Sequence, residues 1–292
     1  MTENPTETFT LGHSPDSDDA FMFYAMAKGK IDLRGYRFEH RLEDIQTLNE
    51  RAQRGELHIS AISIHAYAYV ADKYALLPCG ASMGDGYGPV VIRKHPTNTE
   101  RSTPTQERDA RNPLRSGTIA VPGKMTSAFL ALQLFLGEFK FIVVPFDKIF
   151  DAVESGRADA GLIIHEGQLT YARSGFEKIV DLGEWWKRKT GLPLPLGGNV
   201  VRKDIPPPVR RDISEIIRDS IDYGLAHRDE AVAYSLAFAR DMNSQLASKF
   251  IGMYVNEWTV DYGPTGRRAV QTLLDRAAER GFVPSVNVVF AG

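Results

Sequence analysis

The sequence is poor in cysteine, in long apolar runs and in excess charge of either sign. Its single cysteine, Cys79, excludes an intrachain disulfide and a metal site built from two or four cysteines. No apolar run reaches the roughly 18 residues that a membrane span needs, so we expect no membrane segment. A formal net charge of −2 lacks the basic excess of a general nucleic-acid surface, so we expect no nucleic-acid partner.

The amino terminus lacks the pattern of a secretory signal, because no basic segment followed by an apolar one lies between Met1 and Phe9. The length of 292 residues and a hydrophobic content of 43% allow one large domain or two lobes with full cores. We therefore expect a cytoplasmic globular protein.

Strand and helix signals alternate in two separate series. The first series favours strands at 8–11, 37–41 and 57–62 and helices at 20–28, 45–54 and 63–71. The second favours strands at 118–121, 139–144 and 158–164 and helices at 127–137 and 148–155. Such alternation predicts an α/β protein with mixed, mainly parallel sheets covered by helices.

The two series resemble each other in detail. Pro15–Phe21 is similar to Pro122–Phe129, and Arg54–Ser60 is similar to Ser155–Gly161. Each copy runs strand, loop, helix, strand, helix, glycine, strand. Two copies predict two similar lobes with a cleft between them; the alternative is chance similarity within one doubly wound sheet.

Two Gly/Pro-rich stretches mark where the chain would cross between lobes. Gly80–Pro89 and Gly191–Gly198 each precede an apolar strand signal. They predict a first lobe of residues 1–93 and 197–292 and a second lobe of residues 94–196. The polar stretch 94–116 reads as an exposed connection. The remainder is mainly helical, with helices expected at 209–227, 230–239, 243–255 and 263–280.

Ligands of open α/β sheets sit beyond the carboxyl ends of the strands. The candidate stretches there are Ser14–Asp19, Ser60–Ser63, Gly123–Ser127 and His165. The loop ending at Thr126 and Ser127 opens a helix, so its N–H groups and hydroxyls suit a carboxylate; a plain helix cap is the alternative. The three carboxylates of Ser14–Asp19 disfavour an anion there, so capping or hydroxyl recognition is expected.

His165 ends an apolar strand and is followed by Glu166. An imidazole with an unperturbed pKa of about 6.5 is mostly neutral at neutral pH, which makes His165 a candidate general base. A structural histidine is the alternative, and His58, in a similar strand of the first series, is expected to be structural.

Several motifs spread along the chain point to one family. They are Ser14-Pro15…Asp19…Phe21, Glu43-Asp44…Thr47-Leu48-Asn49, Leu57…Ser60…Ser63…Ala66-Tyr67, Gly88-Pro89, Ile164-His165-Glu166…Thr170-Tyr171, Asp181-Leu182-Gly183…Trp185-Trp186…Thr190–Gly197 and Tyr254-Val255-Asn256…Thr259. On these motifs the chain resembles the 1,4-dihydroxy-6-naphthoate synthases of the futalosine route to menaquinone.

The resemblance implies the fold of type II periplasmic binding proteins and a lyase that needs neither metal nor cofactor. It implies that cyclic dehypoxanthine futalosine, a small carboxylate, is cleaved to the naphthoate and a sugar-derived fragment. It also implies that His165 is the general base and that Asn49, Ser63, Thr126 and Ser127 line the ligand site. The alternatives are chorismate dehydratase on the same fold and a binding protein for small carboxylates without catalysis.

The chain departs from the family pattern in two places. The first loop reads Ser14-Pro15-Asp16-Ser17-Asp18-Asp19, where the family usually has Ser-Pro-Cys-Pro-Asn-Asp. The polar stretch Thr97–Ser116 is longer than expected. Because His165 is present, we expect the first departure to affect substrate detail rather than the class of reaction.

Overall fold

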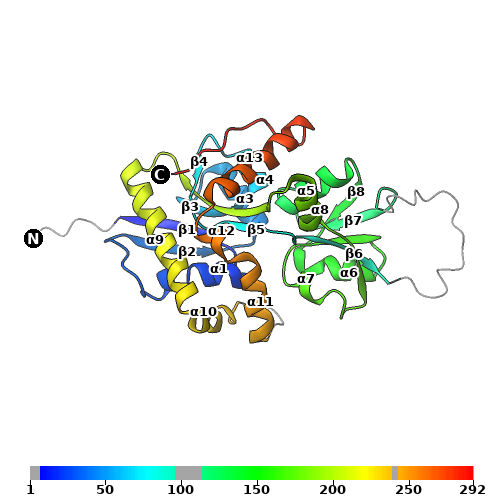
Figure 1. Ribbon diagram of the computed structural model, residues 1–292, viewed down its shortest axis with the longest axis horizontal. Coiled ribbons are helices and arrows are strands. Elements are labelled where there is room, and N and C mark those ends of the chain that lie inside the picture. The colour runs from blue at the N-terminus through cyan, green and yellow to red at the C-terminus, as the bar shows by residue number, and fades with distance from the viewer. Residues whose placement is uncertain (1–6, 96–113, 239–242, 292) are drawn as a thin grey trace, which may run out of the picture. The chain divides into compact units, whose positions relative to one another are not determined.

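The computed structural model describes residues 7–95, 114–238 and 243–291 (Figure 1). The chain divides into two compact units: unit 1 comprises residues 1–84 and 195–292, and unit 2 comprises residues 85–194. Most of the long polar stretch Thr97–Ser116 lies outside the described residues.

Unit 1 contains both ends of the chain and a sheet with helices packed on it. Its strands are β1 (Thr8–His13), β2 (Arg37–Leu42), β3 (Ile59–Ser63), β4 (Tyr74–Leu76), β5 (Ser82–Gly84) and β11 (Leu194–Arg202). Its helices are α1 (Ser17–Met22), α2 (Tyr24–Ala27), α3 (Ile45–Arg54), α4 (Ile64–Tyr67), α9 (Pro207–Ala226), α10 (Arg228–Ser235), α11 (Ser244–Tyr254), α12 (Glu257–Val260) and α13 (Gly263–Glu279).

The sheet of unit 1 has the order β2-β1-β3-β11-β4, and β5 pairs with β11. Strand β1 is parallel to both β2 and β3, and β11 is antiparallel to β3 and β4. The register pairs His13 with Leu42 and Gly12 with Ser60. The carboxyl ends of β1, β2 and β3 therefore lie at one edge of this sheet.

Two clusters of buried apolar side chains hold this sheet to its helices. The larger joins β1 and β3 to α1 and α9 and includes Leu11, Ile59, Phe21 and Ile217. In a smaller cluster Leu48 of α3 packs with Ala61 of β3 and with Leu57. Every residue of β3 is buried, as expected of a strand inside a covered sheet.

Unit 2 repeats this architecture with fewer helices. Its strands are β6 (Val90–Lys94), β7 (Thr118–Val121), β8 (Lys140–Val143), β9 (Ala160–Ile163) and β10 (Phe176–Asp181). Its helices are α5 (Ser127–Leu136), the 3-10 helix η2 (Phe146–Lys148), α6 (Ile149–Glu154), α7 (Gly167–Thr170) and α8 (Leu182–Thr190). The sheet order is β10-β6-β9-β7-β8, with β7 parallel to β8 and β9 and with β6 antiparallel to β9 and β10.

Helix α8 shows how local sequence sets an element of unit 2. The Asp181 carboxylate accepts hydrogen bonds from the N–H groups of Gly183 and Glu184, and Gly191 ends the helix at φ 72°. A Cβ on Gly183 would lie 1.8 Å from the carbonyl oxygen of Tyr87. Only glycine fits at this close approach, which explains the Asp181-Leu182-Gly183 motif.

The structure confirms the predicted α/β class and the mixed sheets. Along the strand order β2-β1-β3-β11-β4 and along the order β10-β6-β9-β7-β8, two neighbouring pairs are parallel and two are antiparallel. The helix at 45–54 and the strand at 118–121 have the expected bounds. The helix expected at 20–28 is instead divided at Phe23 into α1 and α2. The helix expected at 148–155 begins at Ile149, because η2 occupies the residues before it.

The boundary between the units differs from the expected lobes. The sequence predicts that residues 1–93 belong to the first lobe, but unit 2 begins at Asp85. The physical reason is the pairing of β6, which hydrogen-bonds to β9 and β10 of unit 2. The later boundary falls at Pro195, two residues before the expected position.

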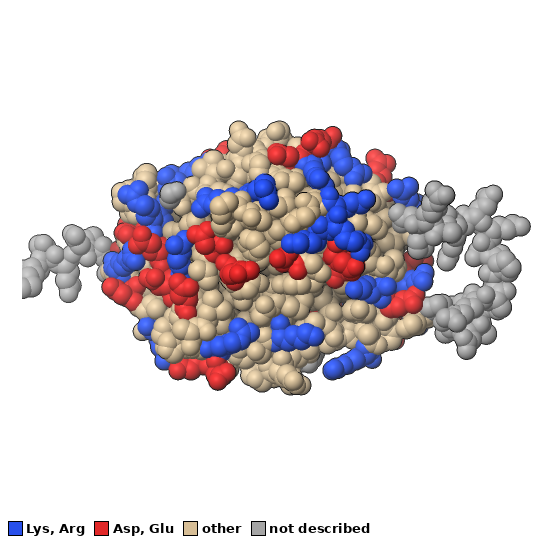
Figure 2. Space-filling view, viewed as in Figure 1, with Lys and Arg blue, Asp and Glu red and all other residues tan. Residues whose placement is uncertain are grey.

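The surface carries both signs of charge. Figure 2 shows acidic and basic side chains interspersed on the viewed face, with uncharged surface between them. In the described part of the chain, no helix is both long and apolar enough to cross a membrane.

The end of the chain is held against unit 1 by a buried hydroxyl. Phe290 bridges to Leu76 of β4, so the final segment extends the sheet. The Tyr67 hydroxyl donates to the carbonyl oxygen of Val289 at 3.2 Å and accepts from the N–H of Val289 at 3.0 Å. One side chain of α4 thus satisfies two backbone groups of the final segment.

We predict that Tyr67→Phe destabilises the protein by about 1–2 kcal/mol, because two backbone groups lose their partner. Tyr69→Phe is the matched control, since the Tyr69 hydroxyl donates one bond to Phe282 and the residue is 42% exposed. Urea unfolding of both variants measures the difference. Equal stability of the two variants would contradict this role of Tyr67.

Candidate functional site

In unit 2, candidate groups follow three neighbouring strands at one edge of the sheet. The loop to Thr126 follows β7, Phe146 lies shortly after β8, and His165 lies shortly after β9. Because β8, β7 and β9 are neighbours and run parallel, their carboxyl ends share that edge.

Thr126 orders the loop that opens α5. Its Oγ1 accepts from the N–H of Phe129 at 3.1 Å and donates to the carbonyl oxygen of Gly123 at 3.1 Å. Thr126 and Ser127 are both buried, and most of the ten residues of α5 are buried as well. The predicted N-cap is confirmed, and the start of α5 is placed where its N–H groups act with little competition from water.

The tautomer of His165 follows from its backbone contacts. Its Nε2 lies 3.1 Å from the carbonyl oxygen of Phe146, which can only accept, so Nε2 carries a hydrogen. Its Nδ1 accepts from the N–H of Gly167 at 3.2 Å. In the neutral ring, Nδ1 is therefore the basic nitrogen.

Glu166 is placed to stabilise the protonated ring. Its Oε2 lies 3.2 Å from Nδ1 of His165, and the two side chains are only 8% and 14% exposed. Once Nδ1 takes a proton, the imidazolium donates from Nε2 to Phe146 and from Nδ1 to the Glu166 carboxylate. When the ring is charged, the two side chains thus form a charge-assisted pair away from bulk water.

In unit 1, Asn49 and Ser63 form a buried pair at the carboxyl end of β3. The Asn49 Oδ1 accepts from the N–H of Ser63 at 2.8 Å, and the Asn49 Nδ2 donates to the Ser63 Oγ at 3.1 Å. The two residues are 0% and 4% exposed. The structure thus brings together two of the residues that the resemblance assigned to the ligand site.

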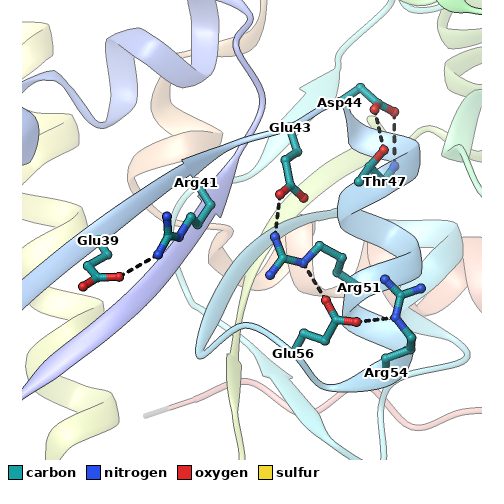
Figure 3. A network of polar contacts seen from close by, with 8 residues as sticks. All are labelled: Glu39, Arg41, Glu43, Asp44, Thr47, Arg51, Arg54 and Glu56. Atoms are coloured by element: carbon teal, nitrogen blue, oxygen red, sulfur yellow. Dashed lines mark hydrogen bonds and ion pairs between the residues drawn. The ribbon is translucent and has the colours of Figure 1, made fainter.

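A surface network braces α3, the helix that carries Asn49 (Figure 3). The Asp44 carboxylate caps the helix by accepting from the N–H groups of Gln46 and Thr47. Arg51 binds Glu43 before the helix at 2.5 Å and Glu56 after it at 2.7 Å. Each exposed pair contributes little alone, but together they connect both ends of α3.

The acidic first loop is closed by a buried carboxylate. Asp16 occupies the N-cap position of α1 but makes no side-chain capping bond. Asp19 instead reaches back, and its Oδ2 accepts from the N–H of Ser14 at 2.7 Å. Burial, with the nearby charge of Asp16, raises the pKa of Asp19 to about 6. The loop thus presents a carboxyl group that titrates near neutrality.

His13 and His58 have structural surroundings. His13 lies 3.0 Å from both the Ser14 carbonyl oxygen and His40, and burial together with His40 lowers its pKa to about 4. The Nδ1 of His58 lies 2.9 Å from the Oγ1 of Thr10, which joins β1 to the chain entering β3. These contacts differ from those of His165, whose ring faces the Glu166 carboxylate.

The described residues hold no group of three or more His, Cys, Asp or Glu side chains placed to bind a metal ion. The sequence does not predict the contact of His165 with Phe146, because it is made by a backbone carbonyl and does not depend on the side chain of residue 146. The adjacency of Glu166 to His165 was visible in the sequence, but their contact through Nδ1 was not.

We predict that Asp19→Asn stabilises the protein above neutral pH. A raised carboxyl pKa means that the native state favours the protonated form of Asp19. The stability that this protonated carboxyl group contributes is present below pH about 4 and is lost as pH rises through about 6. The variant keeps an acceptor for Ser14 without the charge. Its advantage should reach roughly 2–3 kcal/mol at pH 7.5.

Urea unfolding of both proteins between pH 4 and 8 measures this difference. His13 titrates in an overlapping range with the opposite slope, but it is present in both proteins and cancels in the comparison. A difference that does not change with pH would show that Asp19 is not the titrating group.

Comparison with known proteins identifies the family. A family model described as menaquinone biosynthesis matches residues 9–279. A 1,4-dihydroxy-6-naphtoate synthase of Thermus thermophilus is 38% identical over 285 residues, which cover 97% of this chain and 99% of that protein. A protein of the same name from Streptomyces coelicolor is 36% identical over 286 residues and 96% of each chain.

Solved structures agree with this assignment. A crystal structure of a protein from Archaeoglobus fulgidus has a TM-score of 0.87 and 40% identity, covering 96% of this chain and 100% of its own. A Candida albicans protein with the generic periplasmic binding protein fold has a TM-score of 0.63 and 16% identity over 99% of each chain, which shows the fold alone. The predicted family and fold are therefore confirmed: this chain belongs to the menaquinone biosynthesis family and has the periplasmic binding protein fold.

Proposed function

We propose that the protein is a 1,4-dihydroxy-6-naphthoate synthase, a lyase that cleaves cyclic dehypoxanthine futalosine to 1,4-dihydroxy-6-naphthoate and a sugar-derived fragment. Two curated relatives of that name match nearly its whole length. The observation that carries the proposal is the His165–Glu166 pair, because it supplies a base whose protonated form is already stabilised. A cytoplasmic location fits such a biosynthetic enzyme.

Forming an aromatic naphthoate requires removal of a proton bound to carbon, and aromatisation supplies driving force. In the proposed mechanism the proton goes to Nδ1 of His165, the nitrogen left basic by the Phe146 carbonyl, and the Gly167 N–H gives up its hydrogen bond to that nitrogen. Glu166 then accepts a hydrogen bond from the imidazolium. A positioned base contributes about 10²–10⁴-fold to the rate, and it distinguishes an enzyme from a binding protein on the same fold.

The substrate carboxylate is assigned to the start of α5. The Thr126 hydroxyl is engaged with Gly123 and Phe129, so its main role is to hold the loop in place. Ser127, the first residue of the helix, and the N–H groups of the first turn supply the donors. In unit 1, the buried Asn49 and Ser63 are the proposed ligand-binding residues.

We predict that His165→Ala and His165→Asn reduce turnover by about 10²–10⁴-fold while binding of the product naphthoate changes little. Turnover of cyclic dehypoxanthine futalosine and the dissociation constant of 1,4-dihydroxy-6-naphthoate are measured separately. His95→Ala is the control, since His95 is 65% exposed and pairs only loosely with Glu177 at 3.6 Å.

Full turnover in both His165 variants would place the base elsewhere. Absence of turnover in the unmodified protein, with chorismate dehydration observed instead, would favour the sister reaction. Absence of both activities with tight carboxylate binding would favour a binding protein.

Substitution of Ser127 should affect naphthoate binding, whereas substitution of Thr126 should affect the stability of the protein. We predict that Ser127→Ala weakens naphthoate binding by roughly 10- to 100-fold with little loss of stability, because it removes one hydrogen bond to a charge. Thr126→Ala should lower stability by about 1 kcal/mol through loss of the N-cap, and Thr126→Ser should restore it. Naphthoate binding that is unchanged in Ser127→Ala would remove Ser127 from the carboxylate site.

A further inference from the structure

We propose that Gly167 is a positioning residue for the base: Phe150 and Ile163 hold its N–H on Nδ1 of His165, and this hydrogen bond keeps the nitrogen unprotonated until the substrate delivers its proton. Phe150 in turn acts on His165 through Gly167. The inference deepens the proposed function and rests on it, because it takes His165 to be the base. It involves residues of unit 2 alone.

Two groups of opposite character contact the same nitrogen. The N–H of Gly167 and the Oε2 of Glu166 each lie 3.2 Å from Nδ1 of His165. The N–H can only donate, so it stabilises the ring that has a lone pair on Nδ1, whereas the carboxylate stabilises the ring that has a hydrogen there. A base must start in the first state and end in the second. Gly167 therefore opposes Glu166 before the reaction.

The turn that follows His165 directs the Gly167 N–H at a side chain. The N–H groups of Gln168 and Leu169 donate to the carbonyl oxygens of His165 and Glu166, at 2.9 and 2.8 Å. The Gly167 N–H instead donates to the imidazole. Its place relative to Nδ1 thus depends on where the backbone of Gly167 lies.

Apolar side chains fix that place by packing directly on the glycine. A Cβ on Gly167 would lie 2.9 Å from Cγ2 of Ile163 and 2.9 Å from Cε2 of Phe150, closer than real Cβ contacts. Ile163 is fully buried, and the Phe150 ring packs against Phe176 with centroids 5.0 Å apart. A side chain at residue 167 would therefore shift the backbone, and the contact with Nδ1 is already at the long end of the normal range.

Charged side chains on the neighbouring elements of unit 2 are exposed, apart from Glu166. Strand β9 and helix α7 carry no titratable side chain. Lys148 of η2 pairs with Asp147 at 4.0 Å and with Asp151 of α6 at 3.4 Å, and Glu154 is also exposed. Exposed pairs of this kind are screened by water and salt. They are also unchanged in the variants below, so they cancel in the comparison.

Gly167→Ala tests the role through the titration of His165. The neutral ring loses a partner while the imidazolium keeps Glu166, so the pKa of His165 should rise. We expect a rise of about 0.5–1 pH unit, the size of one neutral hydrogen bond. Nitrogen-15 NMR of the ligand-free protein measures this pKa. The acid limb of kcat/KM for cyclic dehypoxanthine futalosine should move with it.

Two further variants separate this role from packing alone. Leucine lacks the ring atoms that a Cβ on Gly167 would meet, so adding Phe150→Leu to Gly167→Ala should return the pKa of His165 part of the way. Gly117→Ala is the matched control, because a Cβ there would lie 2.9 Å from the Asp159 side chain. Gly117 precedes β7, at the opposite edge of the sheet from His165, and its substitution should leave the pKa of His165 unchanged.

An equal loss of activity at every pH in Gly167→Ala, with the pKa of His165 unchanged, would show that Gly167 serves packing alone and would overturn the proposal. If Gly167→Ala does not fold, Phe150→Leu alone decides, since it loosens the same contact and keeps the glycine. A raised pKa of His165 in that variant supports the proposal, and an unchanged pKa overturns it. Absence of turnover in the unmodified protein would overturn the proposed function, whereas the NMR titration would still decide the role of Gly167.

Discussion

Backbone groups at the strand ends fix the hydrogen positions on which the candidate chemistry depends. A carbonyl can only accept and an N–H can only donate, so each determines the state of the side chain that faces it. The Phe146 carbonyl places the hydrogen on Nε2 of His165, and the Ser63 N–H orients the Asn49 amide. The parallel strands matter because they bring such groups to one edge within each unit.

Much of the fold was predictable where local signals are strong. Helix α3 has its expected bounds because Asp44 caps its start and Gly55, at φ 72°, ends it. The three-residue strands β4 and β5 were not predicted, because they are short and pair with β11 far along the chain. The assignment of β6 to unit 2 likewise depends on its distant partners, which no local pattern contains.

The residues of the candidate site could be predicted from the sequence, but the tautomer of His165 could not. The helix start at Thr126 and the pairing of Asn49 with Ser63 lie where strand ends predicted polar groups. The basic nitrogen of His165 depends on contacts between residues that no sequence pattern links. The predicted cleft between the lobes stays a prediction.

The tautomer of His165 is the central claim, and nitrogen-15 NMR of the imidazole tests it most directly. The His165 signals are assigned by their loss in His165→Asn and followed in the ligand-free protein above the pH at which the ring is protonated. The account predicts a protonated Nε2 and an unprotonated Nδ1, as the carbonyl of Phe146 and the N–H of Gly167 require. A hydrogen on Nδ1 with a bare Nε2 would contradict it.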